Sequence, residues 1–237
     1  MSIDAIIQCR FGSRRLPAKI LLPLNENINS LDFLIENLKS INSLRNIIIT
    51  TPNDQYKNLF NAYAKKYKIK IYSPNTNEKN VLKRYYLTAK KYKSKNILRI
   101  TSDCPFININ IISEMVNKYK KEKLEFLTNN NPRFVPHGFD CEIFSSALMD
   151  KIYKKAKSKF DKEHVTTWFR KKYPKKALSI SVYKENFSHL RITLDYLSDY
   201  EFFIKNFNFL NKLSKAKNHK KMIIAFLRKN KKIKFKF

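Results

Sequence analysis

The residues best suited to chemistry gather in one loop near the amino terminus, directly after a short apolar run. Three arginines fall within six residues of this loop, beside a lysine, a serine and one of only two glycines in the chain. Arginine presents a planar fork that matches phosphate oxygens, and glycine lets the backbone approach an anion closely. The loop therefore predicts a phosphate-binding site, although a solvated basic loop would have the same composition. Its members are Arg10, Gly12, Ser13, Arg14, Arg15 and Lys19.

Two aspartates follow predicted strands further along the chain. Asp103 comes directly after the apolar run 96–101, and Asp195 comes after the run 190–194. Carboxylates at the carboxyl ends of neighbouring strands can converge on one Mg²⁺, which prefers protein carboxylates combined with substrate phosphates. Either aspartate alone could instead cap a helix. Together with a phosphate loop, the pair predicts a magnesium site.

Two shorter segments combine acids with a glycine or a histidine. Gly138 precedes Asp140 and Glu142, whose spacing of two places both acids on one face of a strand. Glu163 stands beside His164 at the start of a predicted helix. Both segments could line a polar site. They could equally be a half-exposed strand facing water and an ordinary helix start, in which an early acid favours the helix dipole.

The elements that must position these residues alternate between apolar strands and amphipathic helices, which predicts an α/β domain with a mostly parallel sheet. Strands are expected at 3–9, 47–50, 70–72, 96–101 and 125–127, and helices at 31–41, 54–68, 81–87 and 111–119. Beyond residue 129 we expect strands at 140–144, 178–182 and 190–194 and helices at 146–157, 161–171, 198–211 and 218–228. We interpret the chain 1–237 as a single domain in which 130–188 is an inserted α+β subregion.

Composition limits the remaining classes of protein. The 237 residues include 43% hydrophobic residues, enough for a folded core, and carry a formal net charge of +30. That charge could indicate a nucleic-acid or acidic-membrane partner, but most of the 49 basic residues are lysines spread along the chain, which favours compositional drift. Unpaired cysteine spacing, the lack of a secretory signal and the lack of a long apolar run predict a cytoplasmic protein with no membrane partner.

Six blocks in a fixed order resemble the acidic-sugar cytidylyltransferases, a group that includes acylneuraminate and ketodeoxyoctonate cytidylyltransferases. The branch they look closest to is the spore-coat polysaccharide cytidylyltransferase-like proteins. The first block is similar to the signature I-I-Q-A-R-M-G-S-x-R-L-P-x-K, and the resemblance covers about residues 3–203. The chain departs from the family pattern at Cys9, Phe11 and Asn80. The blocks are 6–19, 80–86, 99–105, 138–144, 163–166 and 190–195.

The resemblance implies a Rossmann-like nucleotidyltransferase fold, usually a homodimer whose inserted subregion helps to form the interface. It implies the Mg²⁺-dependent reaction of CTP with an acidic sugar, giving a CMP-sugar and pyrophosphate in surface glycan biosynthesis. It assigns nucleotide binding to Gln8, Arg10, Gly12, Ser13, Arg15, Lys19, Arg84 and Ser102. It assigns catalysis to Arg15, Lys19 and Asp103, and metal binding to Asp103 and Asp195. It assigns acceptor binding to Gly138, Asp140, Glu142, Glu163, His164 and Arg191.

Two alternatives remain open from the sequence. The acceptor could be a phosphonate or a polyol phosphate in place of an acidic sugar. From another class, the chain could be a basic nucleic-acid-binding protein, although neither an RNP-type aromatic motif nor a helix-turn-helix pattern is evident. Affinity for random DNA that persists at physiological salt would favour the nucleic-acid binder.

Overall fold

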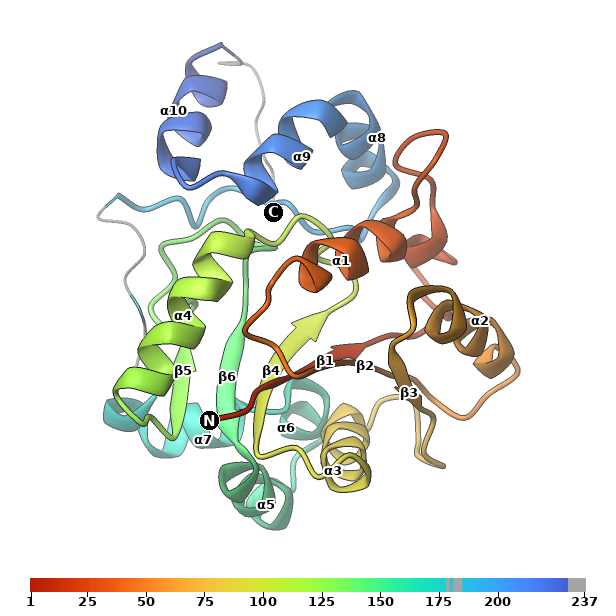
Figure 1. Cartoon of the computed structure of the whole chain (residues 1–237), viewed down its shortest axis with the longest axis vertical. Helices are drawn as coiled ribbons and strands as arrows, with labels where there is room; N and C mark the ends of the chain where they lie inside the picture. The colour runs from red at the N-terminus through yellow and green to blue at the C-terminus, as the bar shows by residue number, and fades with distance from the viewer. Residues whose placement is uncertain (178–179, 181–184, 230–237) are drawn as a thin grey trace.

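A six-stranded sheet forms the centre of the protein and carries helices on both faces (Figure 1). The computed structural model describes residues 1–177, 180 and 185–229. The strand order is β3-β2-β1-β4-β6-β5, in which β1 to β4 run parallel and β6 is antiparallel to both of its neighbours. The strands are β1 Asp4–Gln8, β2 Asn46–Thr50, β3 Lys70–Tyr72, β4 Asn96–Thr101, β5 Phe126–Thr128 and β6 Glu142–Ser145.

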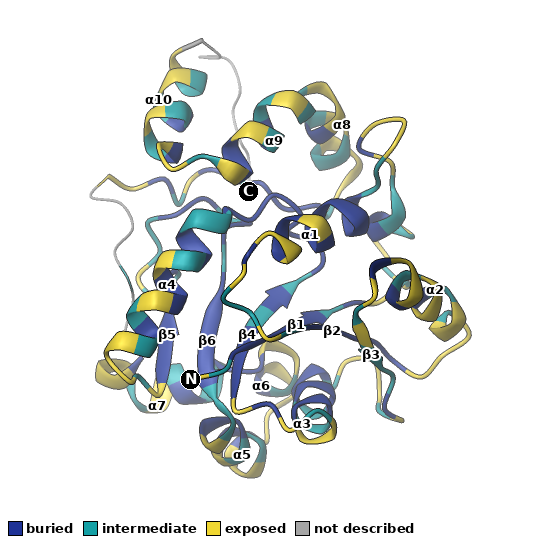
Figure 2. Ribbon diagram, in the orientation of Figure 1, coloured by how far each residue is buried: buried dark blue, intermediate teal, exposed yellow. Residues whose placement is uncertain are grey.

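Both faces of the sheet are apolar because side chains alternate along each strand. On β1, Ala5 and Ile7 pack into a core with α1, α4 and the carboxyl-terminal helices, whereas Ile6 packs against α3, α5 and α7. Figure 2 shows that the strands other than the edge strand β3 are mainly buried, between helices whose outer sides are exposed. The helices are α1 Ser30–Lys39, α2 Lys57–Tyr67, α3 Val81–Lys91, α4 Ile109–Lys121, α5 Ser146–Lys155, α6 Lys159–His164, α7 Thr167–Lys172, α8 Leu197–Lys205, α9 Phe207–Lys215 and α10 His219–Lys229.

The predicted α/β fold with a mostly parallel sheet is confirmed, but the strand expected at 190–194 is wrong. Among the described residues, this segment forms one isolated bridge, from Arg191 to His137. Its apolar alternation has another cause: Leu190, Ile192 and Leu194 are buried in the core, and Thr193 between them is buried as well. The pattern therefore reflects an extended segment that packs on the core and is not a strand of the sheet.

A second prediction is wrong in part, because the helix expected at 161–171 is two helices. Helix α6 ends before Val165, which has a φ of 62° and cannot continue it, and α7 begins at Thr167. Apart from Ile180, the strand expected at 178–182 lies outside the described residues. The segment 130–188 contributes β6 to the main sheet, between β4 and β5, and α5, α6 and α7 to one face of it.

The order of the strands places the loops of interest around one crevice. From β1, the chain winds to β2 and β3 on one side, and β4 lies on the other side. In such a sheet, ligands bind where the loops diverge at the carboxyl ends of the strands. Gln8 pairs in register with Thr101, so the loop after β1 and the loop after β4 begin side by side. None of the described helices is long and apolar enough to cross a membrane.

Candidate active site

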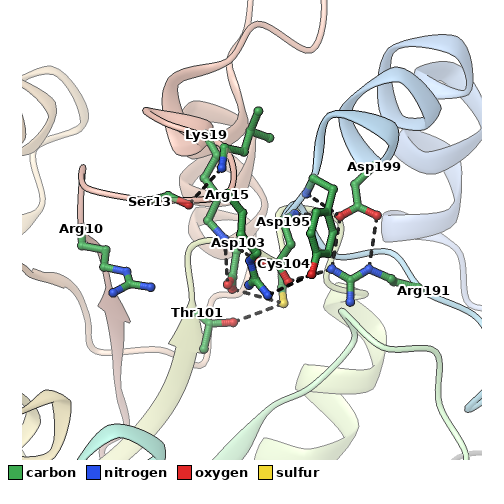
Figure 3. A network of polar contacts seen from close by, with 12 residues as sticks. Arg10, Ser13, Arg15, Lys19, Thr101, Asp103, Cys104, Arg191, Asp195 and Asp199 are labelled. Atoms are coloured by element: carbon green, nitrogen blue, oxygen red, sulfur yellow. Dashed lines mark hydrogen bonds and ion pairs between the residues drawn. The ribbon is translucent and has the colours of Figure 1, made fainter. Parts of the chain in front are cut away.

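Lys19 lies between the two aspartates that the sequence predicts as metal ligands (Figure 3). It opens a short 3₁₀ helix, Lys19–Leu21, at the end of the basic loop. Its side chain is 8% exposed, and Nζ lies 3.2 Å from Asp103 Oδ2 and 2.7 Å from Asp195 Oδ1. Three distant parts of the chain therefore meet at one ammonium group.

Asp195 contacts two further cations. Arg15 lies 2.8 Å away and Arg191 lies 2.7 Å away. Burial would raise the pKa of Asp195, but hydrogen bonds and charges from Lys19, Arg191 and Arg15 outweigh it and lower the pKa to about 2. The carboxylate is therefore ionised at neutral pH, and it holds three cations at the mouth of the crevice.

Asp199 and Tyr196 also contact this cluster and hold its cations in place. Neither residue is among those predicted from the sequence. Asp199, in the first turn of α8, accepts hydrogen bonds from Arg191 and from the backbone N–H of Asp195 at 2.8 Å. The ring of Tyr196 lies 5.0 Å from the guanidinium carbon of Arg15. The signal that could have found them is an acid three residues after the residue that caps the helix, which is the spacing of a capping box.

The two aspartates fit a small divalent cation as a pair. A single ammonium contacts both carboxylates, so one cation can reach both. Within residues 1–177, 180 and 185–229, no group of three or more His, Cys, Asp or Glu side chains could hold a metal ion. Mg²⁺ commonly takes one or two carboxylates and completes its shell with water and substrate phosphates. The two carboxylates of Asp103 and Asp195 match this mode of Mg²⁺ binding.

A cleft of about 310 Å³ opens beside the cluster, at the carboxyl ends of β1 and β4. The structure brings most of the predicted site residues to its wall. Those that line it are Gln8, Arg10, Arg15, Lys19, Arg84, Ser102, Asp103, Asp140, Glu163 and His164. Those that lie outside its lining are Gly12, Ser13, Gly138, Glu142, Arg191 and Asp195.

Arg84 is a buried cation in this wall, and no carboxylate pairs with it among the described residues. It is 1% exposed, and its Nη1 donates to the backbone carbonyls of Asn77 and Glu78. Its Nε is buried with no hydrogen-bond partner. Burial lowers the pKa of Arg84, which reflects the cost of a charge that lacks a counter-ion. Such a guanidinium is suited to an anionic or carbonyl-bearing ligand.

The basic loop is held from the opposite wall by Glu78. Arg10 Nη1 lies 3.4 Å from Glu78 Oε1, and both side chains are half exposed. Gly12 does not have a positive φ, and a Cβ there would lie 3.5 Å from the same oxygen. Ser13 Oγ accepts the backbone N–H of Leu16. Glu78 therefore stands where an anionic ligand of Arg10 would compete with it.

Gly138 has a structural requirement that Gly12 lacks. Its φ is +107°, and a Cβ would lie 2.2 Å from the backbone oxygen of Ile192. Two backbone hydrogen bonds fix this approach, from His137 N–H to Leu190 and from Ile192 N–H to His137. The glycine lets the turn pack against the extended segment that leads to Asp195, and so it positions that acid.

Glu142 lies in a buried ion cluster behind the cleft rather than on its wall. It is 1% exposed, on β6, and lies 3.2 Å from both Arg99 and Arg170. It also accepts the hydroxyl of Thr166 at 2.7 Å. Asp140, by contrast, precedes β6, lines the cleft and pairs with Arg133. The two acids therefore do not share the strand face that their spacing predicts.

A tight turn at Val165 separates the cleft wall from this ion cluster. Val165 has φ 62° and ψ −65°, and the N–H of Thr166 bonds to the carbonyl of His164 at 2.7 Å. A β-branched residue rarely adopts a positive φ, and such strain concentrates at functional sites. The turn leaves Glu163 and His164 on the cleft while Thr166 reaches inward.

Burial shifts the pKa values of the histidine and cysteine side chains that line the cleft. Burial lowers the pKa of His137 and of His164, so both imidazoles are neutral at pH 7. Burial raises the pKa of the Cys9 thiol to about 12 and that of the Cys104 thiol well above its usual range. Neither thiol is a nucleophile, because only the thiolate attacks.

The fold and this cluster define a nucleotidyltransferase, an enzyme that works on phosphates at the carboxyl edge of a parallel sheet. A solved cytidylyltransferase structure from Leptospira borgpetersenii is similar, with a TM-score of 0.84 and 27% identity over 100% of this chain and 98% of that chain. The chain belongs to the cytidylyltransferase family, whose model matches residues 5–233.

Two curated proteins are similar to this chain over most of their length. The uncharacterized protein MJ1063 of Methanocaldococcus jannaschii is 31% identical, over 99% of this chain and 93% of its own length. The spore coat polysaccharide biosynthesis protein SpsF of Bacillus subtilis is 27% identical, over 83% of this chain and 82% of its own length. The resemblance predicted from the six sequence blocks is therefore confirmed at the level of the family.

Proposed function

We propose that this enzyme transfers the CMP moiety of CTP to an acidic sugar in surface glycan biosynthesis, with Mg²⁺, and releases pyrophosphate. The observation that carries the proposal is the position of Lys19, whose ammonium joins Asp103 and Asp195 at the mouth of a basic cleft. The relative SpsF, named as a spore coat polysaccharide biosynthesis protein, supports an acceptor of the sugar class.

The nucleotide lies along the basic loop in this proposal. An oxygen of the acceptor attacks the α-phosphorus, and the bond from that phosphorus to the α–β bridging oxygen breaks, so its electron pair leaves with pyrophosphate. Arg15 and Lys19 neutralise the charge that grows on the leaving group. Asp103 and Asp195 would hold Mg²⁺, which would supply Lewis-acid stabilisation of phosphate oxygens. The remaining nucleotide contacts are Gln8, Arg10, Gly12, Ser13, Arg84 and Ser102.

The acceptor lies on the side of the cleft formed by the turn at Gly138 and by α6. Asp140, Glu163 and His164 line this side, where they can contact acceptor hydroxyls. The neutral imidazole of His164 can accept the proton of the attacking oxygen. Arg191 and Glu142 act from behind the wall. The segment 130–188 serves as the subregion through which two chains pair, which light scattering in solution tests.

Pyrophosphate release tests the proposed function. The enzyme is incubated with Mg²⁺, each of the four nucleoside triphosphates, and a panel of acidic sugars, phosphonates and polyol phosphates. We expect release with CTP and an acidic sugar, and loss of release when EDTA is added. Release only with a phosphonate or a polyol phosphate would show that the acceptor belongs to that class and not to the acidic sugars. No release with any pair, together with salt-resistant binding of random DNA, would overturn the proposal.

A further inference from the structure

Arg99 forms a partly buried link between the ion cluster of Glu142 and the floor of the cleft. It projects from β4 on the same face of the sheet as Gln8, the last residue of β1. Its Nη1 donates to Glu142 Oε2 at 3.2 Å, and its Nη2 donates to Gln8 Oε1 at 3.2 Å. Both Arg99 and Gln8 line the cleft. No role for Arg99 is predicted from the sequence.

This contact decides which end of the Gln8 amide faces the ligand. A guanidinium only donates hydrogen bonds, so the atom of Gln8 that faces Arg99 must be the carbonyl oxygen. The NH₂ group of Gln8 is then turned away from Arg99. Gln8 therefore presents the NH₂ group as a hydrogen-bond donor to the cleft, in a fixed orientation.

Arg99 itself is unable to turn away. Glu142 binds one side of its guanidinium, and the ring of Tyr85 lies 5.9 Å from its central carbon. Glu142 is held in turn by Arg170 and by the hydroxyl of Thr166. A chain of charge-assisted hydrogen bonds thus runs from α7 through β6 and β4 to the end of β1.

We propose that Gln8 reads the base of the nucleotide and that Arg99 is the positioning residue that sets its donor toward the cleft; this rests on the proposed function. The phosphate end of the cleft is fixed by Lys19, and the wall near Gln8 includes the apolar side chains of Cys9 and Val81, which suit a planar ring. The NH₂ group of Gln8 donates to N3 of cytosine. Uracil carries a hydrogen at N3, so two donors would face each other and UTP is disfavoured.

Binding of CTP and UTP in the absence of acceptor tests the role of Gln8 without requiring turnover. Gln8→Glu replaces the donor with an acceptor and keeps the partner of Arg99. We expect the preference for CTP over UTP, measured by calorimetry, to fall about tenfold, the worth of one hydrogen bond. The matched control is Gln55→Glu, at the chain's other glutamine, which is exposed in the turn before α2. It should leave the preference unchanged.

Arg99→Lys tests the positioning role, because lysine keeps the charge opposite Glu142 but loses the fork that joins Glu142 to Gln8. We expect it to lower the CTP preference about as much as Gln8→Glu does. In a Gln8→Ala background, Arg99→Lys should cause no further fall in that preference, because the group it orients is gone. A merely structural role would instead lower affinity for both nucleotides equally in both backgrounds.

The outcomes separate this inference from the proposed function. A wild-type enzyme that releases no pyrophosphate but prefers CTP in binding overturns the function and leaves the base reading standing. A wild-type enzyme that transfers CMP, while Gln8→Glu retains the full CTP preference, overturns the base reading alone. An effect of Gln8→Glu on the KM of the acceptor with no effect on nucleotide preference also overturns it.

Discussion

The two ends of the central sheet each bury a charged cluster, and the clusters differ in how completely they are satisfied. At the amino end, Asp4 is fully buried and accepts hydrogen bonds from Arg45 at 2.9 Å, Asn46 at 2.8 Å and Ser94 at 2.6 Å. Every oxygen of this carboxylate has partners within the protein. At the carboxyl end, the residues around Lys19 open onto a cleft of about 310 Å³.

A structural ion pair and a candidate binding site differ in whether their charges are all paired within the protein. Of the six Arg and Lys side chains on the wall of the cleft, Lys79 and Arg84 form no ion pair with a carboxylate within the described part of the chain, so the cleft has cations to spare for an anionic ligand. One of them, Arg84, is buried without a carboxylate. Perturbed charges concentrate at functional sites, but perturbation alone also occurs in closed networks such as that of Asp4. Cations that lack a carboxylate partner among the described residues distinguish the cluster at the carboxyl end of the sheet from the cluster at the amino end.

Among the variants that separate the two clusters, Asp103→Asn should have the largest effect, and that effect should be on activity. The variant keeps the shape of the side chain but removes one of two carboxylates, and Lewis-acid stabilisation by a bound metal is worth several kcal/mol, or about 10³ in rate. We expect Mg²⁺-dependent pyrophosphate release to be lost while the melting temperature stays near that of the wild type. The control is Asp150→Asn, a partly exposed acid paired with Lys90. Equal loss in both variants would contradict the distinction.

At the amino end, Asp4→Asn should act on stability rather than on activity. Removing the charge weakens the hydrogen bonds of Arg45 and Ser94 to a fully buried group, and bonds to a charged group contribute about 2–3 kcal/mol. Urea unfolding should show that loss, while kcat of the folded enzyme at 25 °C should be unchanged. A variant with normal stability and reduced kcat would reverse the roles assigned to the two ends.

The two glycines give a smaller contrast of the same kind. Gly138→Ala places a Cβ 2.2 Å from the backbone of Ile192 at a φ of +107°, so it should cost about 1–3 kcal/mol in unfolding free energy. Gly12→Ala meets only an ordinary contact and should change stability by less than about 0.5 kcal/mol. Thermal unfolding of both variants checks this ranking. Equal destabilisation would mean that the basic loop is as tightly packed as the turn.

The smallest effect is on the pH dependence of stability. Burial raises the pKa of Asp4, but hydrogen bonds from Arg45, Ser94 and Asn46 outweigh it and lower the pKa below its usual 3.8. The stabilisation is therefore fully present above about pH 4 and is lost as the pH falls through the lower folded-state pKa. The gap in unfolding free energy between wild type and Asp4→Asn should narrow at acidic pH. A constant gap from pH 5 downward would contradict this.

Much of this architecture can be predicted from local pattern alone. The strands at 47–50, 70–72 and 96–101 follow from apolar runs, and the loop after β1 follows from its arginines and lysine. The run 190–194 misleads because an extended segment with an apolar residue at every second position looks like a strand whether or not a neighbour pairs with it.

The contacts that complete the site depend on pairs that are distant in sequence. Arg15 meets Tyr196, and Arg99 meets Gln8, through folding rather than through any spacing that can be read along the chain. The position of Glu142 shows the same limit. Its spacing from Asp140 suggests a shared face, but β6 begins at Glu142, and Arg99 and Arg170 draw its carboxylate inward.

The most direct test of the central claim is pyrophosphate release from CTP by Lys19→Ala, measured beside Lys121→Ala. Lys121 is an exposed lysine at the end of α4 and controls for the loss of one positive charge. Removing one preorganised group that stabilises transition-state charge commonly costs ~10²–10³ in kcat. The account predicts a fall of that size for Lys19→Ala and none for Lys121→Ala. Near-normal turnover by a folded Lys19→Ala variant would contradict the claim that this ammonium stands at the catalytic centre.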